Sequence, residues 1–277
     1  MESWGVTMSL PAGISGKSRI ELAEVFASGK RFISPSNVVD ALGVEPRIAA
    51  AKLSQWARAG WVRRVRRGLY IGVPVDTRVP FSWSEDPLQV ASVVWTPCYF
   101  TGWTAAKHWA LTDQVFRTTV LKTSDRVRAS HDQLLDHEYL VSHTNEANME
   151  WGLKSEWSDE FRLLFADPAR TVVDILDNPS IGGGVRHSAE ILSEYLDNHD
   201  PKTLVQYADR LGNRTIFKRL GYLTEVLGRE LPDLVAACRE RLSAGISLLD
   251  PDGRRDGPRL MKWGIQVNAS IAKEEPS

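Results

Sequence analysis

With 277 residues, of which 43% are hydrophobic and 25% charged, the chain has the composition of a folded protein and enough length for two domains. No run approaches the roughly 20 apolar residues that cross a bilayer, and the N-terminus lacks the pattern of a signal peptide, so we expect a cytoplasmic protein without membrane contact. The two cysteines, Cys98 and Cys238, belong to no CxxC pair, which argues against a disulfide framework and a zinc site. We therefore expect no cofactor and no bound metal.

The formal net charge of −1 hides an uneven distribution along the chain. Residues 1–80 contain 12 Lys or Arg against 6 Asp or Glu, whereas the remaining residues contain 22 against 29. A basic segment of this kind favours binding to nucleic acid, so the N-terminal end is the first place to look for a site.

Three helix-like segments follow one another in this basic end. Ser34 before Pro35 is typical of a helix N-cap and first turn, and glycines at positions 29, 43 and 60 stand where each segment stops. We expect helices over residues 17–27, 35–42 and 46–59. Because only residues 44–45 separate the second helix from the third, the pattern predicts a helix-turn-helix.

The third predicted helix has two different sides when its residues are placed at about 100° each. The side expected to pack in the core comprises Ala49, Ala50, Leu53, Trp56 and Ala57. The opposite side comprises Arg47, Ala51, Ser54, Gln55 and Arg58. Small and basic side chains suit a helix that enters the major groove of DNA, which is about 12 Å wide.

A β-hairpin with arginines at its tip is predicted directly after Gly60. From Arg47 to Arg67 there are seven Lys or Arg and no acidic residue, so helix and hairpin are expected to form one basic surface. The residues that we predict to contact double-stranded DNA are Arg47, Lys52, Ser54, Gln55, Arg58, Arg63, Arg64, Arg66 and Arg67. A solvated charged surface or a protein-binding winged helix remains the alternative.

A larger mixed domain is predicted after a proline-rich connection. We place a winged helix-turn-helix domain at residues 17–76, a linker at 77–87 and an α+β domain at 88–270. In that domain we expect helices over residues 88–95 and 102–111, and strands over residues 118–121, 138–142, 149–154 and 161–165. A helical portion begins at Pro168, and two β-prone pieces, 246–249 and 261–267, are expected to return to the sheet.

Motifs of catalytic chemistry are incomplete in this sequence. Residues 15–18 (SGKS) resemble the end of a phosphate loop, but Pro11 stands where the leading glycine is required. The three glycines at 182–184 are interpreted as a turn. A nuclease would need clustered carboxylates, for which Asp167, Asp174 and Asp177 are the candidates, and Asp167 before Pro168 is better explained as an N-cap. We expect no catalytic residue and no enzymatic activity.

A series of motifs resembles the AbiEi family, antitoxins of type IV toxin-antitoxin and abortive-infection systems. Residues 60–70 (GWVRRVRRGLY) resemble the family's wing, and 99–106 (YFTGWTAA), with Leu111 and Gln114, resemble the start of its second domain. Further motifs lie at residues 166–174 (ADPARTVVD), 177–184 (DNPSIGGG), 219–225 (RLGYLTE), 249–251 (LDP) and 263–268 (WGIQVN). The resemblance covers the chain from Lys17 to Asn268.

This resemblance implies a repressor that binds DNA repeats near its own promoter through the N-terminal domain. It also implies a neighbouring toxin of nucleotidyltransferase type, which the C-terminal domain counteracts without a stable complex. We interpret the motif residues as structural: Gly102, Gly183 and Gly221 for turns or close approach, and Asp174 with Arg219 as a buried pair. Two alternatives stay open, a repressor that senses a small ligand without any toxin and a DNA-directed nuclease.

Overall fold

The computed structural model describes residues 15–74 and 85–271, which group into two units. Of these described residues, the first unit comprises those up to Val90 together with 133–137, and the second comprises 91–132 and 138–271. The predicted linker at 77–87 lies mostly outside the described residues, and the predicted domain boundaries therefore stay predictions. No helix of the described ranges is long and apolar enough to cross a bilayer.

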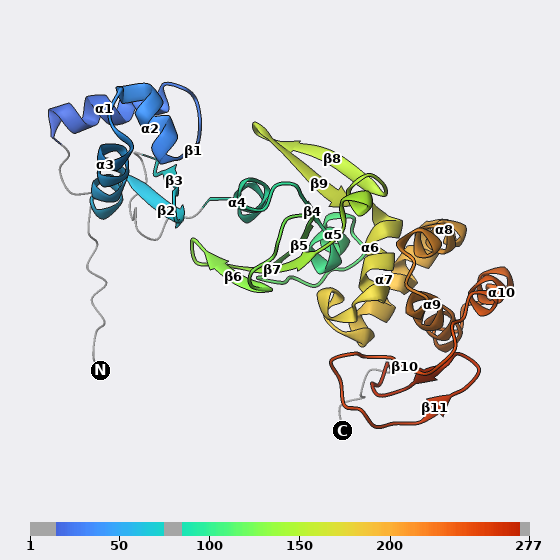
Figure 1. The fold of residues 1–277 in the computed structure, drawn as a ribbon. Helices are drawn as coiled ribbons and strands as arrows, with labels where there is room; N and C mark the ends of the chain where they lie inside the picture. The colour runs from blue at the N-terminus through green and yellow to red at the C-terminus, as the bar shows by residue number, and fades with distance from the viewer. Residues whose placement is uncertain (1–14, 75–84, 272–277) are drawn as a thin grey trace, which may run out of the picture. The chain divides into compact units, whose positions relative to one another are not determined.

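Three helices form most of the first unit (Figure 1). They are α1 (Gly16–Phe26), α2 (Pro35–Leu42) and α3 (Pro46–Arg58), as the sequence predicted to within one or two residues. The side chain of Ser34 caps α2 and is itself paired with Asn37 in a capping box, and Gly43 ends the helix with a φ of 61°. These local capping signals are why the helix-turn-helix could be located from sequence.

A three-stranded sheet completes the winged helix-turn-helix. The predicted hairpin consists of β2 (Val62–Arg66) and β3 (Leu69–Gly72), which pair antiparallel. Strand β1 (Phe32–Ile33), which sequence reasoning missed, pairs antiparallel with β3 and gives the order β1-β3-β2. The core between helices and sheet is lined by Val25, Ile33, Val38, Ala49, Leu53, Trp56, Val62 and Tyr70.

The second unit contains a mixed six-stranded sheet with the order β6-β7-β5-β4-β9-β8. Its strands are β4 (Cys98–Phe100), β5 (Thr119–Thr123), β6 (His131–Leu134), β7 (His137–His143), β8 (Leu153–Ser158) and β9 (Phe161–Ala166). Strands β5 and β7 pair parallel, as do β4 and β9, whereas β4–β5 and β8–β9 are antiparallel. The strand predicted over 149–154 begins only at Leu153, because residues 146–149 form a 3₁₀ turn.

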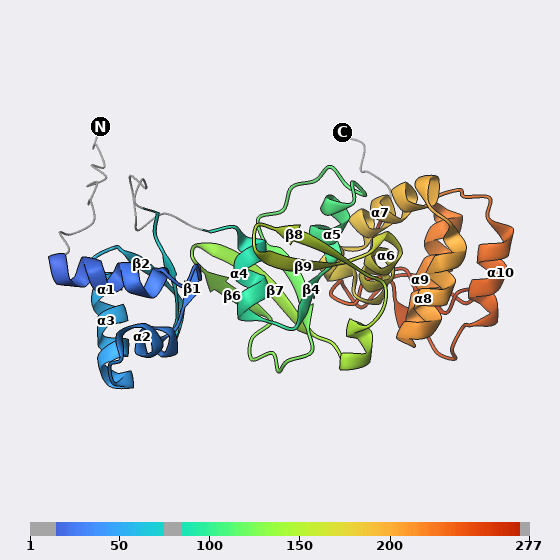
Figure 2. The same cartoon turned by 90° about the horizontal axis from the view of Figure 1, so that it is seen from above.

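Helices surround α6 on one side of this sheet. The predicted helices α4 (Pro87–Val94) and α5 (Gly102–His108) precede it, and the helical portion consists of α6 (Pro168–Asp177), α7 (Val185–Asn198), α8 (Pro201–Leu211), α9 (Thr215–Val226) and α10 (Pro232–Glu240). Helix α6 packs against α5, α7, α8 and α9, an arrangement that can be followed in Figures 1 and 2. The N-cap predicted at Asp167 is confirmed, since its side chain accepts a hydrogen bond from the amide of Arg170.

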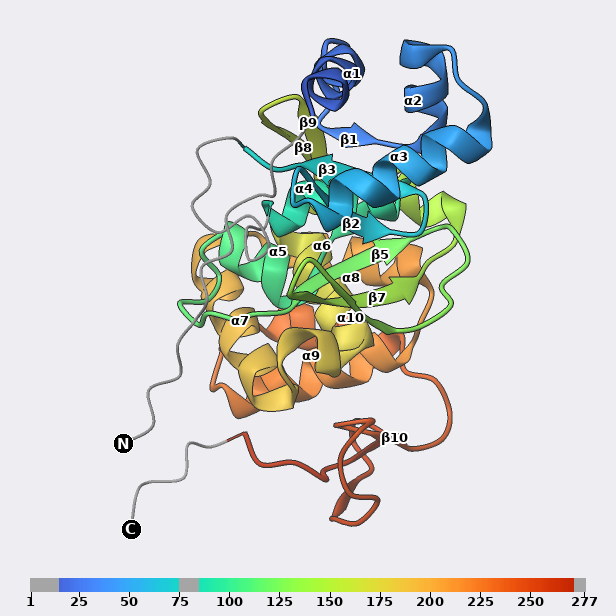
Figure 3. The same cartoon turned by 90° about the vertical axis from the view of Figure 1, so that its left-hand side faces the viewer.

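The prediction that the C-terminal β-prone pieces return to the large sheet is wrong. Strands β10 (Ser247–Leu248), β11 (Arg259–Leu260) and β12 (Ile265–Gln266) form a separate sheet with the order β10-β12-β11. Figures 1 and 3 show the helices of the second unit between β10 and the six-stranded sheet. Trp263 packs this small sheet on α9, where a Cβ at Gly221 would lie 2.1 Å from the indole ring. The close approach predicted at Gly221 is thus present, and it ties the C-terminal strands to a helix.

Candidate nucleic-acid interface

Helix α3 buries a narrow stripe and leaves most of its other residues exposed. Ala49, Leu53 and Trp56 are buried, as the helical periodicity predicted. The expectation was wrong for Ala50, which is exposed, because the stripe with spacing i, i+4 and i+7 leaves its position outside the contact. The broad remaining surface of α3 is available for a partner.

The predicted polar side of α3 faces solvent. Arg47, Ser54, Gln55 and Arg58 are all exposed. The hydroxyl of Ser54 donates to the carbonyl oxygen of Ala50 at 3.0 Å, and Nε of Arg58 lies 3.4 Å from the carbonyl oxygen of Ser54. Ser54 and Arg58 therefore bond within the helix, while Arg47 and Gln55 are exposed to solvent.

The wing carries three further exposed arginines. Arg64, Arg66 and Arg67 are exposed, while Val65 between them is buried. Side chains alternate between the two faces of a strand, so Arg64 and Arg66 face solvent on either side of the buried Val65. The register between β2 and β3 is irregular between these two arginines. Gly68 makes the turn with a φ of 79°, a backbone conformation that favours glycine.

Two of the seven predicted cations are paired with carboxylates of the protein itself. Nζ of Lys52 lies 2.6 Å from Oε2 of Glu21 on α1, and Nη2 of Arg63 lies 2.9 Å from Oδ2 of Asp136. The other five, Arg47, Arg58, Arg64, Arg66 and Arg67, form no ion pair with the described residues. Because α3 packs against β2, as Figures 1 and 3 show, these five arginines come from neighbouring elements.

A family comparison agrees with this arrangement of helices and wing. Residues 21–71, from α1 to β3, match the family described as transcriptional regulator, AbiEi antitoxin. The winged helix is an AbiEi domain. The match confirms the resemblance for the winged helix and describes it as part of a family of transcriptional regulators. The motifs of the second unit lie outside residues 21–71, so their resemblance stays a prediction.

The fold of the AbiEi domain and the unit that follows it recurs in a solved structure. The crystal structure of the RV2827C protein from Mycobacterium tuberculosis is similar over 90% of this chain and 89% of its own, with a TM-score of 0.63 and 14% sequence identity. At this identity the likeness concerns the fold alone. No curated protein matches the sequence.

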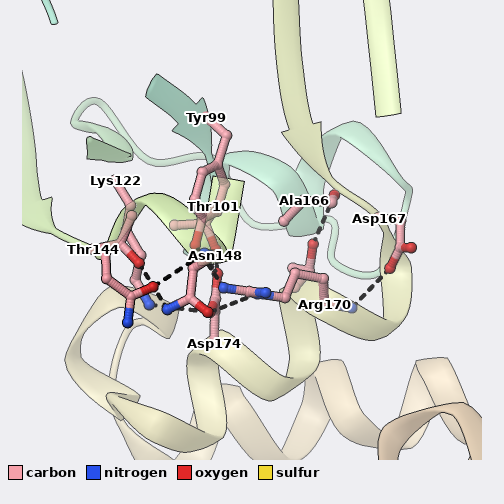
Figure 4. Close-up of polar contacts among 11 residues, drawn as sticks. Tyr99, Thr101, Lys122, Thr144, Asn148, Ala166, Asp167, Arg170 and Asp174 are labelled. Atoms are coloured by element: carbon pink, nitrogen blue, oxygen red, sulfur yellow. Dashed lines mark hydrogen bonds and ion pairs between the residues drawn. The ribbon is translucent and has the colours of Figure 1, made fainter. Parts of the chain in front are cut away.

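Outside the AbiEi domain, the second unit contains a buried polar cluster centred on Asp174 (Figure 4). The carboxylate accepts hydrogen bonds from Lys122 Nζ and Arg170 Nε at 3.0 Å each, from Thr101 Oγ1 at 2.8 Å and from Tyr99 Oη at 3.1 Å. Burial by itself would raise the pKa of Asp174, but the two neighbouring cations outweigh it and the pKa is lowered. Asp174 is therefore a fixed anion that neutralises buried cations, which is a structural role.

The partners predicted for Asp174 were wrong. Arg219 does not reach it; the guanidinium instead donates to the carbonyl oxygens of Leu176, Asp177, Leu248 and Leu249, at 2.7 to 3.1 Å. Sequence reasoning missed Lys122 and Tyr99 because they lie in strands far along the chain. The spacing of Arg170 and Asp174, four apart on one helix, was the signal that could have found this pair.

The three aspartates weighed as nuclease ligands serve other contacts. Asp167 caps α6 and accepts from Tyr207 Oη at 2.8 Å, and Asp177 accepts from the side-chain amide of Asn213 at 2.6 Å. In residues 15–74 and 85–271, no three His, Cys, Asp or Glu side chains lie close enough together to hold a metal ion.

A groove opens between α8 and α10 of the second unit, with a volume of about 470 Å³. Its lining combines apolar residues such as Val205, Leu231 and Leu234 with the charged side chains of Lys202 and Asp233. This volume falls in the range of small-molecule sites, about 300–1,000 Å³. The groove is where a ligand of the second unit would be sought.

Proposed function

We propose that the chain is the DNA-binding antitoxin of a type IV toxin-antitoxin system and that its AbiEi domain represses the operon encoding it. The observation that carries the proposal is the set of five exposed, unpaired arginines on α3 and the wing, in a domain of a regulator family. Guanidinium groups along a helix and a hairpin neutralise phosphates of a duplex and release counterions, which drives binding. Ser54 and Gln55 lie on the same side of α3 and supply groups that hydrogen-bond base edges.

A reporter gene placed under the chain's own promoter tests repression. The wild-type chain is expected to lower expression, and a variant with Arg47, Arg58, Arg64 and Arg67 all changed to Ala is expected to lose this effect. A matched control changes four exposed arginines of the second unit, Arg186, Arg254, Arg255 and Arg259, to Ala and is expected to repress like wild type. Repression that survives in the first variant would reject the proposed interface.

The second unit is proposed to counteract a nucleotidyltransferase-like toxin encoded beside it, without forming a stable complex. Support comes from the neighbouring domain, which matches a family described as AbiEi antitoxin. Co-expression of the chain with the toxin, from a promoter unrelated to the operon, tests this. Wild type and the variant with Arg47, Arg58, Arg64 and Arg67 changed to Ala should both restore growth. Failure of the wild-type chain to relieve toxicity would reject the antitoxin role while leaving DNA binding intact.

A ligand-responsive repressor is the second candidate, and the α8–α10 groove is the observation that favours it. A bound metabolite would raise the melting temperature by mass action. Thermal shift measurements with metabolite mixtures test this, using Val205→Trp to fill the groove as the comparison. A shift that occurs in wild type and disappears in the variant would support ligand sensing.

A further inference from the structure

Helix α3 exposes a large apolar side chain on the surface that otherwise carries arginines. Ile48 is 46% exposed, although it lies between the charged Arg47 and the buried Ala49. Ala51 and Gln55, three and seven positions later, lie on the same stripe of the helix and are also exposed. The core of the winged helix is formed without Ile48, so packing within the described unit does not explain its apolar side chain.

The place of Ile48 in the helix suits contact with bases. It is the third residue of α3, in the first turn after Pro46. In helix-turn-helix proteins the N-terminal residues of the motif's second helix, which is α3 in this chain, contact base edges in the major groove. Arg47 beside it and Gln55 two turns further are exposed as well, which makes the apolar spot part of a face with positive charge. Such a charge pattern complements a duplex rather than a hydrophobic protein partner.

The chemical groups that DNA presents in its major groove then restrict what Ile48 can recognise. The 5-methyl group of thymine is the apolar group that base pairs present in the major groove, and apolar side chains contact it. We infer that Ile48, in the first turn of α3, reads a thymine methyl group in the operator and so selects an A·T pair there. This inference rests on the proposed DNA binding and adds a specificity-determining residue to it. Gln55 on the same stripe is consistent with a preference for A·T pairs, because a glutamine amide can form two hydrogen bonds with adenine.

Replacing thymine by deoxyuridine tests the inference, because it removes the methyl group and keeps every hydrogen-bonding group of the base. The DNA is the segment of the chain's own upstream region that the wild-type protein protects from cleavage. Loss of the contacted methyl should weaken wild-type binding by about fourfold, the factor that corresponds to burying one methyl-sized group. Ile48→Ala should bind thymine and deoxyuridine duplexes with nearly equal affinity.

A matched variant controls for general effects of the substitution. Ile20 on α1 is 63% exposed, and Ile20→Ala should keep the wild-type ratio between the two duplexes. If wild type binds its upstream DNA selectively but shows no preference for thymine, or if Ile48→Ala keeps the wild-type ratio, the inference is wrong and the DNA-binding proposal stands. If wild type shows no selective binding to its upstream DNA, the proposal and the inference fail together.

Discussion

Lys52 on α3 is tied to Glu21 on α1 by a 2.6 Å contact between Nζ and Oε2, with both side chains largely shielded from solvent. We predicted Lys52 as a DNA contact from the sequence, but in the structure this ion pair directs its charge toward α1. Lys52→Ala should therefore leave the salt dependence of DNA binding unchanged. Arg64→Ala, which removes an unpaired arginine of the wing, should make the slope of log K against log salt less steep by about 1. A slope that is also less steep by about 1 in Lys52→Ala would show that the ion pair opens on DNA.

The buried cluster predicts a large effect of a single carboxylate on stability. Asp174→Ala leaves Lys122 and Arg170 buried without their anion, so the free energy of unfolding should fall by about 3–5 kcal/mol. Asp209→Ala is the control, because Asp209 pairs with Arg214 and Arg241 at the surface and its loss should cost no more than about 1 kcal/mol. Urea unfolding followed by circular dichroism measures the free energy of unfolding of both variants. Similar losses in the two variants would contradict the structural role of Asp174.

The same carboxylate predicts a dependence of stability on pH. Since the pKa of Asp174 is lower in the folded state than the ordinary value of about 3.9, its stabilising contribution is present above that value and is lost as the pH falls through the folded pKa. The difference in unfolding free energy between wild type and Asp174→Asn should be constant near neutral pH and shrink below about pH 4. A difference that stays constant down to the acid transition would mean that Asp174 does not titrate with a lowered pKa.

Gly221 offers a test of how the C-terminal sheet is held. A Cβ there would meet the Trp263 ring at 2.1 Å, and Trp263 is fully buried, so Gly221→Ala should destabilise the protein by about 1–3 kcal/mol. Gly16→Ala introduces the same methyl group into open space in α1 and should be neutral or slightly stabilising. Combining Gly221→Ala with Trp263→Leu should cost less than the sum of the single changes. Strict additivity would place the two residues out of contact.

The parts of the fold that depend on local signals could be predicted from the sequence. Caps such as Ser34 and Asp167 and the glycine at position 43 act within a few residues, so the helices were located closely. Strands β1 and β11 have two residues each, which is too short for a periodic pattern, whereas β10 and β12 lie within the β-prone pieces predicted at 246–249 and 261–267. Their pairing depends on contacts between distant segments, such as that of Trp263 with α9.

The candidate site was predictable in its composition but not in its electrostatics. The run of cations from Arg47 to Arg67 identified the surface, and the exposure of Arg47, Arg64 and Arg67 agrees with it. The partners of Lys52 and Arg63 could not be found in the same way, because they lie 31 and 73 residues away along the chain. The apolar character of Ile48 became informative only when the structure left it outside the core.

The most direct test of the central claim is the salt dependence of binding to a duplex from the chain's own upstream region. Five unpaired arginines in contact with phosphates predict a slope of log K against log salt of about −4.5 for wild type. The variant with Arg47, Arg58, Arg64 and Arg67 changed to Ala should retain a slope of about −0.9, whereas the second-unit control should keep the wild-type value. A slope near zero for wild type, or one that the four substitutions leave unchanged, would contradict DNA binding through this surface.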